Sequence, residues 1–126
     1  MKLRDIYMQA IENGMRIDWR GRTAVDEILE QAKADTGKPG FDQDRLFNPY
    51  GDTRIAFGDE DVEVSTILVG INIHPVHVLQ AAAMRQMGIR VDLALSHHTT
   101  CINRGLYYLN DILDIHRSVS EIVTPK

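Results

Sequence analysis

Residues 64–95 read VSTILVGINIHPVHVLQAAAMRQMGIRVDLAL, and this stretch decides the predicted fold. Val64 to Ile73 is a predicted strand, and its near-continuous apolar run, ILVGI from Ile67 to Ile71, is typical of a strand covered on both faces. Pro75 suits the first turn of a helix, and Gly88 is placed to end it. Val91 to Leu95 is the next predicted strand. Strand, helix and strand within about 30 residues predict a parallel crossover unit.

Three further helical patterns can be assigned from their apolar spacing. We expect the first helix to end at Gly14 and the second to begin at an N-cap, Thr23. A last helix is predicted from Leu106 to Val119. The apolar faces are Leu3, Ile6, Tyr7, Ala10 and Ile11 for the first helix, Val25, Ile28, Leu29 and Ala32 for the second, and Val78, Leu79, Ala82, Ala83 and Met87 for the helix of the crossover unit.

The segment before the crossover unit is rich in turn residues. Asn48 to Asp52 predicts a turn, which an Asx hydrogen bond at Asn48 or Asp52 would stabilise. Thr53 to Phe57 predicts a strand and Gly58 to Asp61 a turn, so we expect a hairpin onto the apolar strand. The fold class is therefore α/β, with a parallel or mixed sheet and flanking helices.

Length and composition limit the class of protein. The 126 residues, 44% of them hydrophobic, predict a single α/β domain, 1–126. A net charge of -4 without a basic block gives no reason to expect nucleic acid as a partner. No apolar run approaches the ~20 residues that span a bilayer, so no membrane is expected. The single Cys101 fits a reducing compartment, and the expected location is cytoplasmic.

His97 and His98 directly follow the second strand of the crossover unit and are the candidate site. Ligands of open parallel sheets bind beyond the carboxyl ends of the strands. In a loop leaving the strand, both imidazoles can turn toward one space and serve neighbouring metal ions. Neutral imidazole binds zinc, iron, manganese, nickel or copper, so the pair predicts a divalent transition metal without identifying it. The ordinary alternative is a solvent-exposed pair without a role.

Three other histidines and the single cysteine could also bind a metal or react, but each has an ordinary structural explanation. His74 and His77 lie at the carboxyl end of the preceding strand, where His74 can approach His97 if the strands are neighbours; the alternative is a capping His74 and a solvent-facing His77. Cys101 is a loop thiol without a recognisable partner, and His116 occupies an apolar helix position typical of a core or interface histidine. No catalytic residue is assigned.

The order of several motifs resembles the amino-terminal half of the Nif-three-like family, some of whose members carry the label GTP cyclohydrolase 1 type 2 homologue. The resemblance runs from about Asp44 to Val119. Its motifs are NPYGDTRI from Asn48, then Gly58-Asp59, then ILVGI from Ile67, then DLALSHH from Asp92. The resemblance implies an α/β fold, a two-metal site and ring-like or dimeric assembly, with His97 and His98 each ligating a metal.

The family completes its metal site with residues that have no counterpart here. These are an Asp from a later strand and a His-x-x-x-Glu motif near the end of a chain about twice this length, and His116 and Glu121 lack that spacing. Either this chain is a fragment or a natural short form, or another protomer or solvent supplies the missing ligands.

Two functional hypotheses follow. The first is a Nif-three-like metal-dependent hydrolase with a partial di-metal site, acting on a small-molecule substrate, for which the family label suggests a purine nucleotide. The second is a non-catalytic interaction or assembly module of the same fold. Both include a homo-oligomer.

Overall fold

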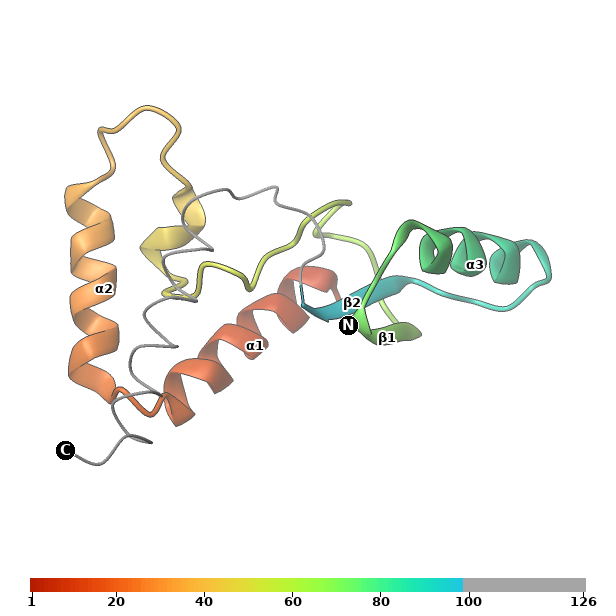
Figure 1. The fold of residues 1–126 in the computed structure, drawn as a ribbon, viewed down its shortest axis with the longest axis horizontal. Coiled ribbons are helices and arrows are strands. Elements are labelled where there is room, and N and C mark those ends of the chain that lie inside the picture. The colour runs from red at the N-terminus through yellow and green to blue at the C-terminus, as the bar shows by residue number, and fades with distance from the viewer. Residues whose placement is uncertain (99–126) are drawn as a thin grey trace, which may run out of the picture. The chain divides into compact units, whose positions relative to one another are not determined.

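The computed structural model describes residues 1–98, with the side chains of residues 1–97. The chain divides into two compact units, one formed by Met1–Gln9 with the segment that starts at Ile55, the other by Ala10–Arg54. The elements are helices α1 (Leu3–Ile17), α2 (Arg22–Ala34) and α3 (Pro75–Gln86), the 3-10 helix η1 (Gln43–Leu46), and strands β1 (Ile67–Asn72) and β2 (Leu93–His98) (Figure 1). None of the described helices is long and apolar enough to cross a membrane.

Strands β1 and β2 pair in parallel, with α3 as the connection between them (Figure 1). Ile67 pairs with Leu93 at one end of the ladder, and Asn72 pairs with His98 at the other. Helix α3 begins at Pro75 and is followed by Gly88, whose φ of 82° is favourable for glycine and ends the helix. The predicted crossover unit and the α/β class are thereby confirmed.

The prediction that the first strand is covered on both faces is wrong for the described chain. Ile67, Val69 and Ile71 are exposed along one face of β1, and only Leu68 and Gly70 are partly covered. Helix α3 has no buried residue, and its half-buried positions are His77, Ala81 and Met84. These lie on a different side of the helix from the five apolar residues predicted to be buried: Val78, Leu79, Ala82, Ala83 and Met87.

Helix α1 does not end at Gly14, as predicted, but continues to Ile17. Leu3 and Ile11 of the predicted apolar face are buried, whereas Ala10 is exposed. Gly14 lies against the ring of Tyr50, and a Cβ atom at this position would be 2.9 Å from Tyr50 Cε2. The glycine therefore permits close approach of an aromatic ring and does not cap the helix.

The ring of Tyr50 is held in place by a polar network. Its hydroxyl donates a hydrogen bond to Asp18 Oδ2 at 3.1 Å, and the Asp18 carboxylate also accepts from the Arg20 guanidinium at 2.8 and 3.0 Å. The Arg20 hydrogen bond is the main cause that lowers the pKa of Asp18 to about 2. Burial, followed by the bond to Asp18, raises the pKa of Tyr50 to about 12. The phenol therefore stays protonated at neutral pH and remains a donor.

Helix α2 begins one residue before the predicted cap. Its N-cap is Gly21, with φ at 83°, and Thr23 lies inside the first turn, so the predicted Thr23 cap is wrong. Val25 and Ala32 of the predicted apolar face are buried, and Ile28 and Leu29 are half-buried. The face was correctly predicted because it depends on helical spacing, whereas the first residue depends on the left-handed backbone that Gly21 adopts.

The predicted strand Thr53 to Phe57 is wrong: these residues are irregular and form no hairpin in the described chain. The buried Asn48 side chain accepts from Tyr50 N–H at 2.8 Å and donates to the Thr53 carbonyl at 2.7 Å, which confirms the predicted Asx turn. Arg54 donates to the carbonyls of Tyr50 and Thr53. Side chains thus satisfy the polar backbone groups that a hairpin ladder would have used.

We expect Gly14→Ala to lower the free energy of unfolding by about 1 kcal/mol, because overpacking costs about 1–3 kcal/mol and outweighs the ~1 kcal/mol that alanine gains in a helix. Urea denaturation measures this difference. Gly37→Ala is the matched control, since an added Cβ meets nothing within 4 Å there. A Gly14→Ala protein as stable as the Gly37→Ala protein would contradict the assigned role of Gly14.

Candidate metal centre

The predicted site lies at the carboxyl edge of the two-stranded sheet. Because β1 and β2 are parallel, their carboxyl ends meet at the same edge, and Asn72 of β1 pairs there with His98 of β2. His97 and His98 are the last two residues of β2. The edge is therefore the position at which open parallel sheets bind ligands.

The predicted conformation of the histidine pair is wrong. We expected both residues in a loop that leaves the strand, but β2 extends to His98 instead of ending at Leu95. Consecutive positions of a strand belong to opposite faces, so the pair does not have the loop geometry that would turn both residues toward one space. The His97 side chain is exposed at this edge.

Ser96 connects the two carboxyl ends and was not identified from the sequence. Its hydroxyl accepts from Ile73 N–H at 3.1 Å and donates to the Ile71 carbonyl at 3.4 Å. The loop after β1 is therefore held beside the residue that precedes His97. A single hydroxyl within the otherwise apolar run of β2, directly before two histidines, is the sequence signal that could have revealed it.

His74 and His77 occupy the start of α3, and the structure corrects the expectation for His77. His74 is the N-cap residue, as the capping alternative predicted, and its N–H donates to His77 Nδ1 at 2.9 Å. Their ring centroids are 5.8 Å apart. His77 is half-buried and does not simply face solvent. Because its Nδ1 accepts a hydrogen bond, the neutral ring carries its proton on Nε2, which leaves no lone pair there for a metal.

His97 and His98 supply only part of the ligands that a metal ion needs. Two adjacent histidines offer neutral imidazole, a ligand for several divalent transition metals. Among the side chains that the structure describes, no three His, Cys, Asp or Glu residues form a group that could hold a metal ion. Cys101, His116 and Glu121 lie outside the described residues.

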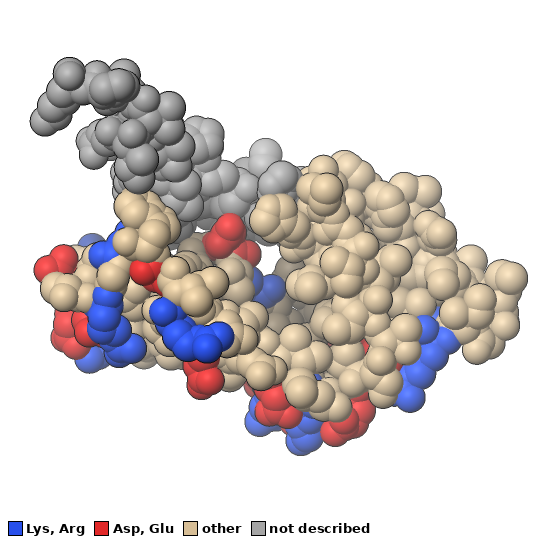
Figure 2. All heavy atoms as spheres, turned by 90° about the horizontal axis from the view of Figure 1, so that it is seen from below, with Lys and Arg blue, Asp and Glu red and all other residues tan. Residues whose placement is uncertain are grey.

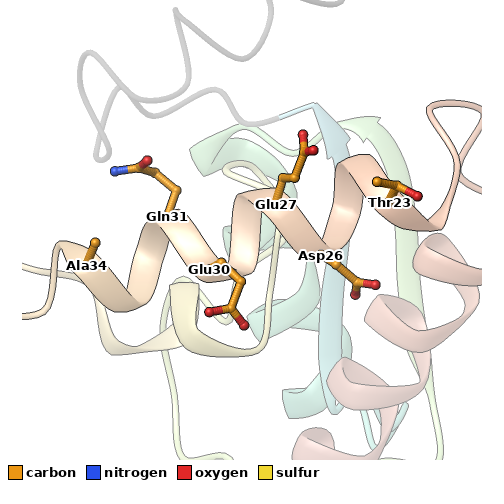
Figure 3. A pocket seen from close by; sticks show the side chains of 6 residues that line it. All are labelled: Thr23, Asp26, Glu27, Glu30, Gln31 and Ala34. Atoms are coloured by element: carbon orange, nitrogen blue, oxygen red, sulfur yellow. The ribbon is translucent and has the colours of Figure 1, made fainter.

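Two other regions have structural explanations. The Arg54 side chain is only 5% exposed and pairs with Asp42 at 3.1 Å, so it stabilises the turn. A shallow hollow on α2 is lined by that helix alone, and in Figure 3 its Glu27 and Asp26 side chains point in different directions. Asp26 pairs with Arg22 at 2.8 Å, as expected of a solvated helix face.

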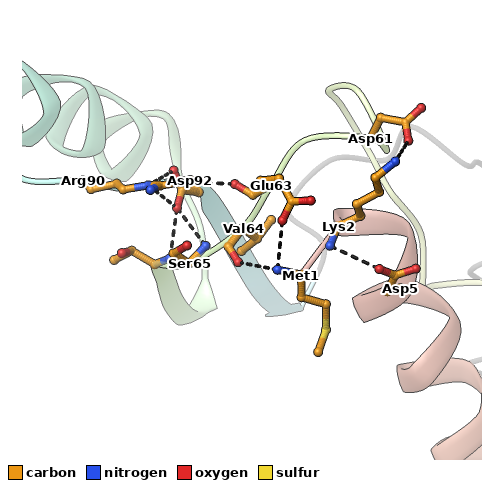
Figure 4. A network of polar contacts seen from close by, with 10 residues as sticks. Met1, Lys2, Asp5, Asp61, Glu63, Val64, Ser65, Arg90 and Asp92 are labelled. Atoms are coloured by element: carbon orange, nitrogen blue, oxygen red, sulfur yellow. Dashed lines mark hydrogen bonds and ion pairs between the residues drawn. The ribbon is translucent and has the colours of Figure 1, made fainter.

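The amino ends of the two strands are joined by Asp92. Its Oδ2 accepts from Ser65 N–H at 2.9 Å and from Thr66 N–H at 3.0 Å, and Arg90 bonds the same carboxylate (Figure 4). The Arg90 hydrogen bond, followed by the bond from Ser65, lowers the pKa of Asp92 to about 2. The charged Asp92 therefore fixes the start of the parallel ladder.

The amino-terminal residues join the same network. The Met1 ammonium group donates to Glu63 Oε2 at 3.1 Å and to the Val64 carbonyl at 3.3 Å, and Lys2 pairs with Asp61 (Figure 4). Lys2 also forms an isolated antiparallel bridge with Glu63. The segment before β1 is thus anchored by the chain's own first residues and not by the predicted hairpin.

No family model, curated protein or solved structure matches this chain. The Nif-three-like resemblance therefore stays a prediction that rests on the motifs of the sequence.

We expect the Asp92 network to make stability depend on acid pH. The pKa of Asp92 is lower in the folded state, about 2, than the ~3.9 of an unfolded aspartate. Its contribution is therefore complete above about pH 4 and is lost as the pH falls towards 2. The difference in free energy of unfolding between the parent and Asp92→Asn should be largest near pH 7 and shrink below about pH 4, measured by urea denaturation.

A constant difference between the parent and Asp92→Asn from pH 7 to pH 2 would contradict the charged network.

Proposed function

We propose that this chain is a Nif-three-like protein in which His97 and His98 hold one or two divalent transition metal ions, and that it acts as a metal-dependent hydrolase. The supporting observation is the parallel pairing of β1 and β2, which places both histidines at the carboxyl edge of the sheet. The upstream motifs of the sequence support the same proposal. The role assigned to each histidine is ligation.

The chemistry of the proposal is that of a Lewis acid. When bound, the metal would activate water for attack on a substrate. His97 and His98 would supply neutral imidazole nitrogens, and Ser96 would position them by holding the loop after β1 against β2. A purine nucleotide is the proposed substrate class, in keeping with the cyclohydrolase label of the resembling family.

The metal proposal predicts that the purified full chain contains bound zinc, iron, manganese or nickel. The double variant His97→Ala with His98→Ala should lose that metal, because both proposed ligands are removed. Elemental analysis after dialysis measures the metal content, and a panel of nucleotides and phosphoesters measures hydrolysis.

His77→Gln is the matched control, since it removes a nearby histidine whose Nδ1 is occupied by a backbone hydrogen bond. It should retain the metal. A parent chain without metal would refute the proposal, as would metal that the double variant keeps. Metal without hydrolysis of any substrate would refute the hydrolase assignment alone.

A second candidate function, an assembly module, is supported by the exposed apolar residues of the crossover unit. Nine large hydrophobic side chains between residues 67 and 95 are 40% to 76% exposed. Figure 2 shows few charged atoms over the end of the molecule that carries α3. We call these residues the apolar surface: Ile67, Val69, Ile71, Val76, Val78, Leu79, Met87, Ile89 and Leu95.

The occupant that we propose for the apolar surface is a second copy of the chain. The stretch 67–95 has only three charged residues, Arg85, Arg90 and Asp92, so two copies would meet with little repulsion between like charges. Strand β1 contains neither charge nor proline, the usual protection of an edge strand. A parallel sheet is normally covered on both faces, and association would provide that cover.

The assembly proposal predicts a homo-oligomer whose mass depends on the apolar surface. We expect Val69→Lys with Leu79→Lys to reduce the mass measured by light scattering to that of one chain, because two buried charges would oppose association. Ile17→Lys, at an exposed apolar residue outside the surface, should leave the mass unchanged. A monomeric parent, or an oligomer that the double variant retains, would contradict the proposal.

A further inference from the structure

We propose that two copies of this chain associate by pairing their β1 strands in antiparallel orientation, about a twofold axis that passes between the two Val69 residues. The two small sheets would thereby join into one sheet of four strands. This inference rests on the assembly module, the second candidate function, and specifies the contact that holds the copies together. That contact is the outer edge of β1, which we define as the edge that faces away from β2.

The outer edge of β1 has no partner strand within the described residues, where the sheet consists of β1 and β2 alone. The N–H of Leu93 donates to the Thr66 carbonyl at 3.2 Å, so the carbonyl of Thr66 is directed to β2. In a parallel pair, residues that bond the neighbouring strand alternate with residues that do not. The backbone N–H groups of Ile67, Val69 and Ile71 consequently point towards the outer edge.

The sequence of β1 is complementary to itself in antiparallel orientation. With Val69 opposite its own copy, Ile67 lies opposite Ile71, and Leu68 lies opposite Gly70. The valine and isoleucine pairs bring β-branched side chains together, a favourable combination across two strands. Strand β1 carries no charge that would repel its copy. These features favour a second copy of β1 over a strand of another protein.

Pairing at the outer edge would also remove two weaknesses of the isolated chain. The side chains of Val69 and Ile71 are 67% and 66% exposed. Opposite residues of an antiparallel pair lie only about 5.5 Å apart, so each would shield its counterpart from water. A two-stranded sheet is marginally stable, whereas three or more strands with a hydrophobic face support themselves. The joined sheet of four strands meets that requirement.

The first test removes the backbone donor at the proposed axis. Val69→Pro lacks the N–H that would bond the second copy, but it leaves the bonds between β1 and β2 in place. Proline is tolerated in an edge strand where its missing N–H would face outward, and the residue before it favours the extended backbone of a strand. Val69→Ala is the matched control, because it shortens the same side chain and keeps the N–H.

We expect the parent chain to be a dimer by light scattering over a range of concentrations. Val69→Pro should raise the dissociation constant of the dimer at least about thirtyfold, because two hydrogen bonds across the axis are lost. Val69→Ala should remain a dimer at concentrations where Val69→Pro is a single chain. Circular dichroism of both variants checks that the helices are retained.

The second test is a cross-link at the same residue, in a chain whose own cysteine is removed by Cys101→Ser. Val69→Cys should form a disulfide between the two copies on mild oxidation, since a separation of about 5.5 Å between Cα atoms suits a disulfide. Met87→Cys is the control. Met87 is 76% exposed and follows the end of α3, far from the proposed axis, so it should cross-link much more slowly.

The outcomes separate edge pairing from the assembly module itself. A folded Val69→Pro protein that dimerises like the parent would refute edge pairing, as would equal cross-linking rates for Val69→Cys and Met87→Cys. The assembly module would survive either result if Val69→Lys with Leu79→Lys is still a single chain. A monomeric parent would refute both proposals. If Val69→Pro does not fold, the cross-linking rates decide.

Discussion

The parallel pairing of β1 and β2 is the constraint on which the candidate site depends, and side chains secure it at both ends. Asp92 binds the Ser65 and Thr66 N–H groups at the amino end, and Ser96 bridges Ile71 and Ile73 at the carboxyl end. A two-stranded sheet is only marginally stable by itself. These side-chain hydrogen bonds therefore do much to fix the register of the two strands. Loss of register would separate every residue of the proposed metal site.

The crossover unit was predicted well because its sequence signals are local. The other predictions failed where contacts between residues distant in the sequence determine the structure. Pro75 and Gly88 specify the ends of α3 through their own backbone preferences, which need no tertiary partner. The strand predicted at Thr53 to Phe57 failed because Arg54 and Asn48 bond the backbone around them, an arrangement that an alternating sequence does not reveal. Gly14 was interpreted as a stop because the approach of Tyr50, 36 residues later, is not visible in helical spacing.

The position of the candidate site was predictable from the sequence, but its geometry was not. The strand end that carries His97 and His98 follows from hydrophobic pattern and chain order alone. Whether a strand stops before a histidine pair or includes it depends on pairing with its neighbour, and β2 continues because His98 has Asn72 as a partner. The role of Ser96 and the capping contact between His74 and His77 depend on individual hydrogen bonds, which residue spacing cannot specify.

The two proposed functions of the crossover unit are physically coupled. The exposed residues of β1 lie on the strand whose last residue, Asn72, pairs with His98 beside the proposed metal ligands. Covering the apolar surface with a second copy would stabilise the parallel pairing and therefore the carboxyl edge. A ligand that binds only the ordered edge would, by linkage, favour the associated state. Metal binding and assembly could therefore occur in the same protein, because the same short sheet would support both. The two proposals differ only in whether the protein is an enzyme.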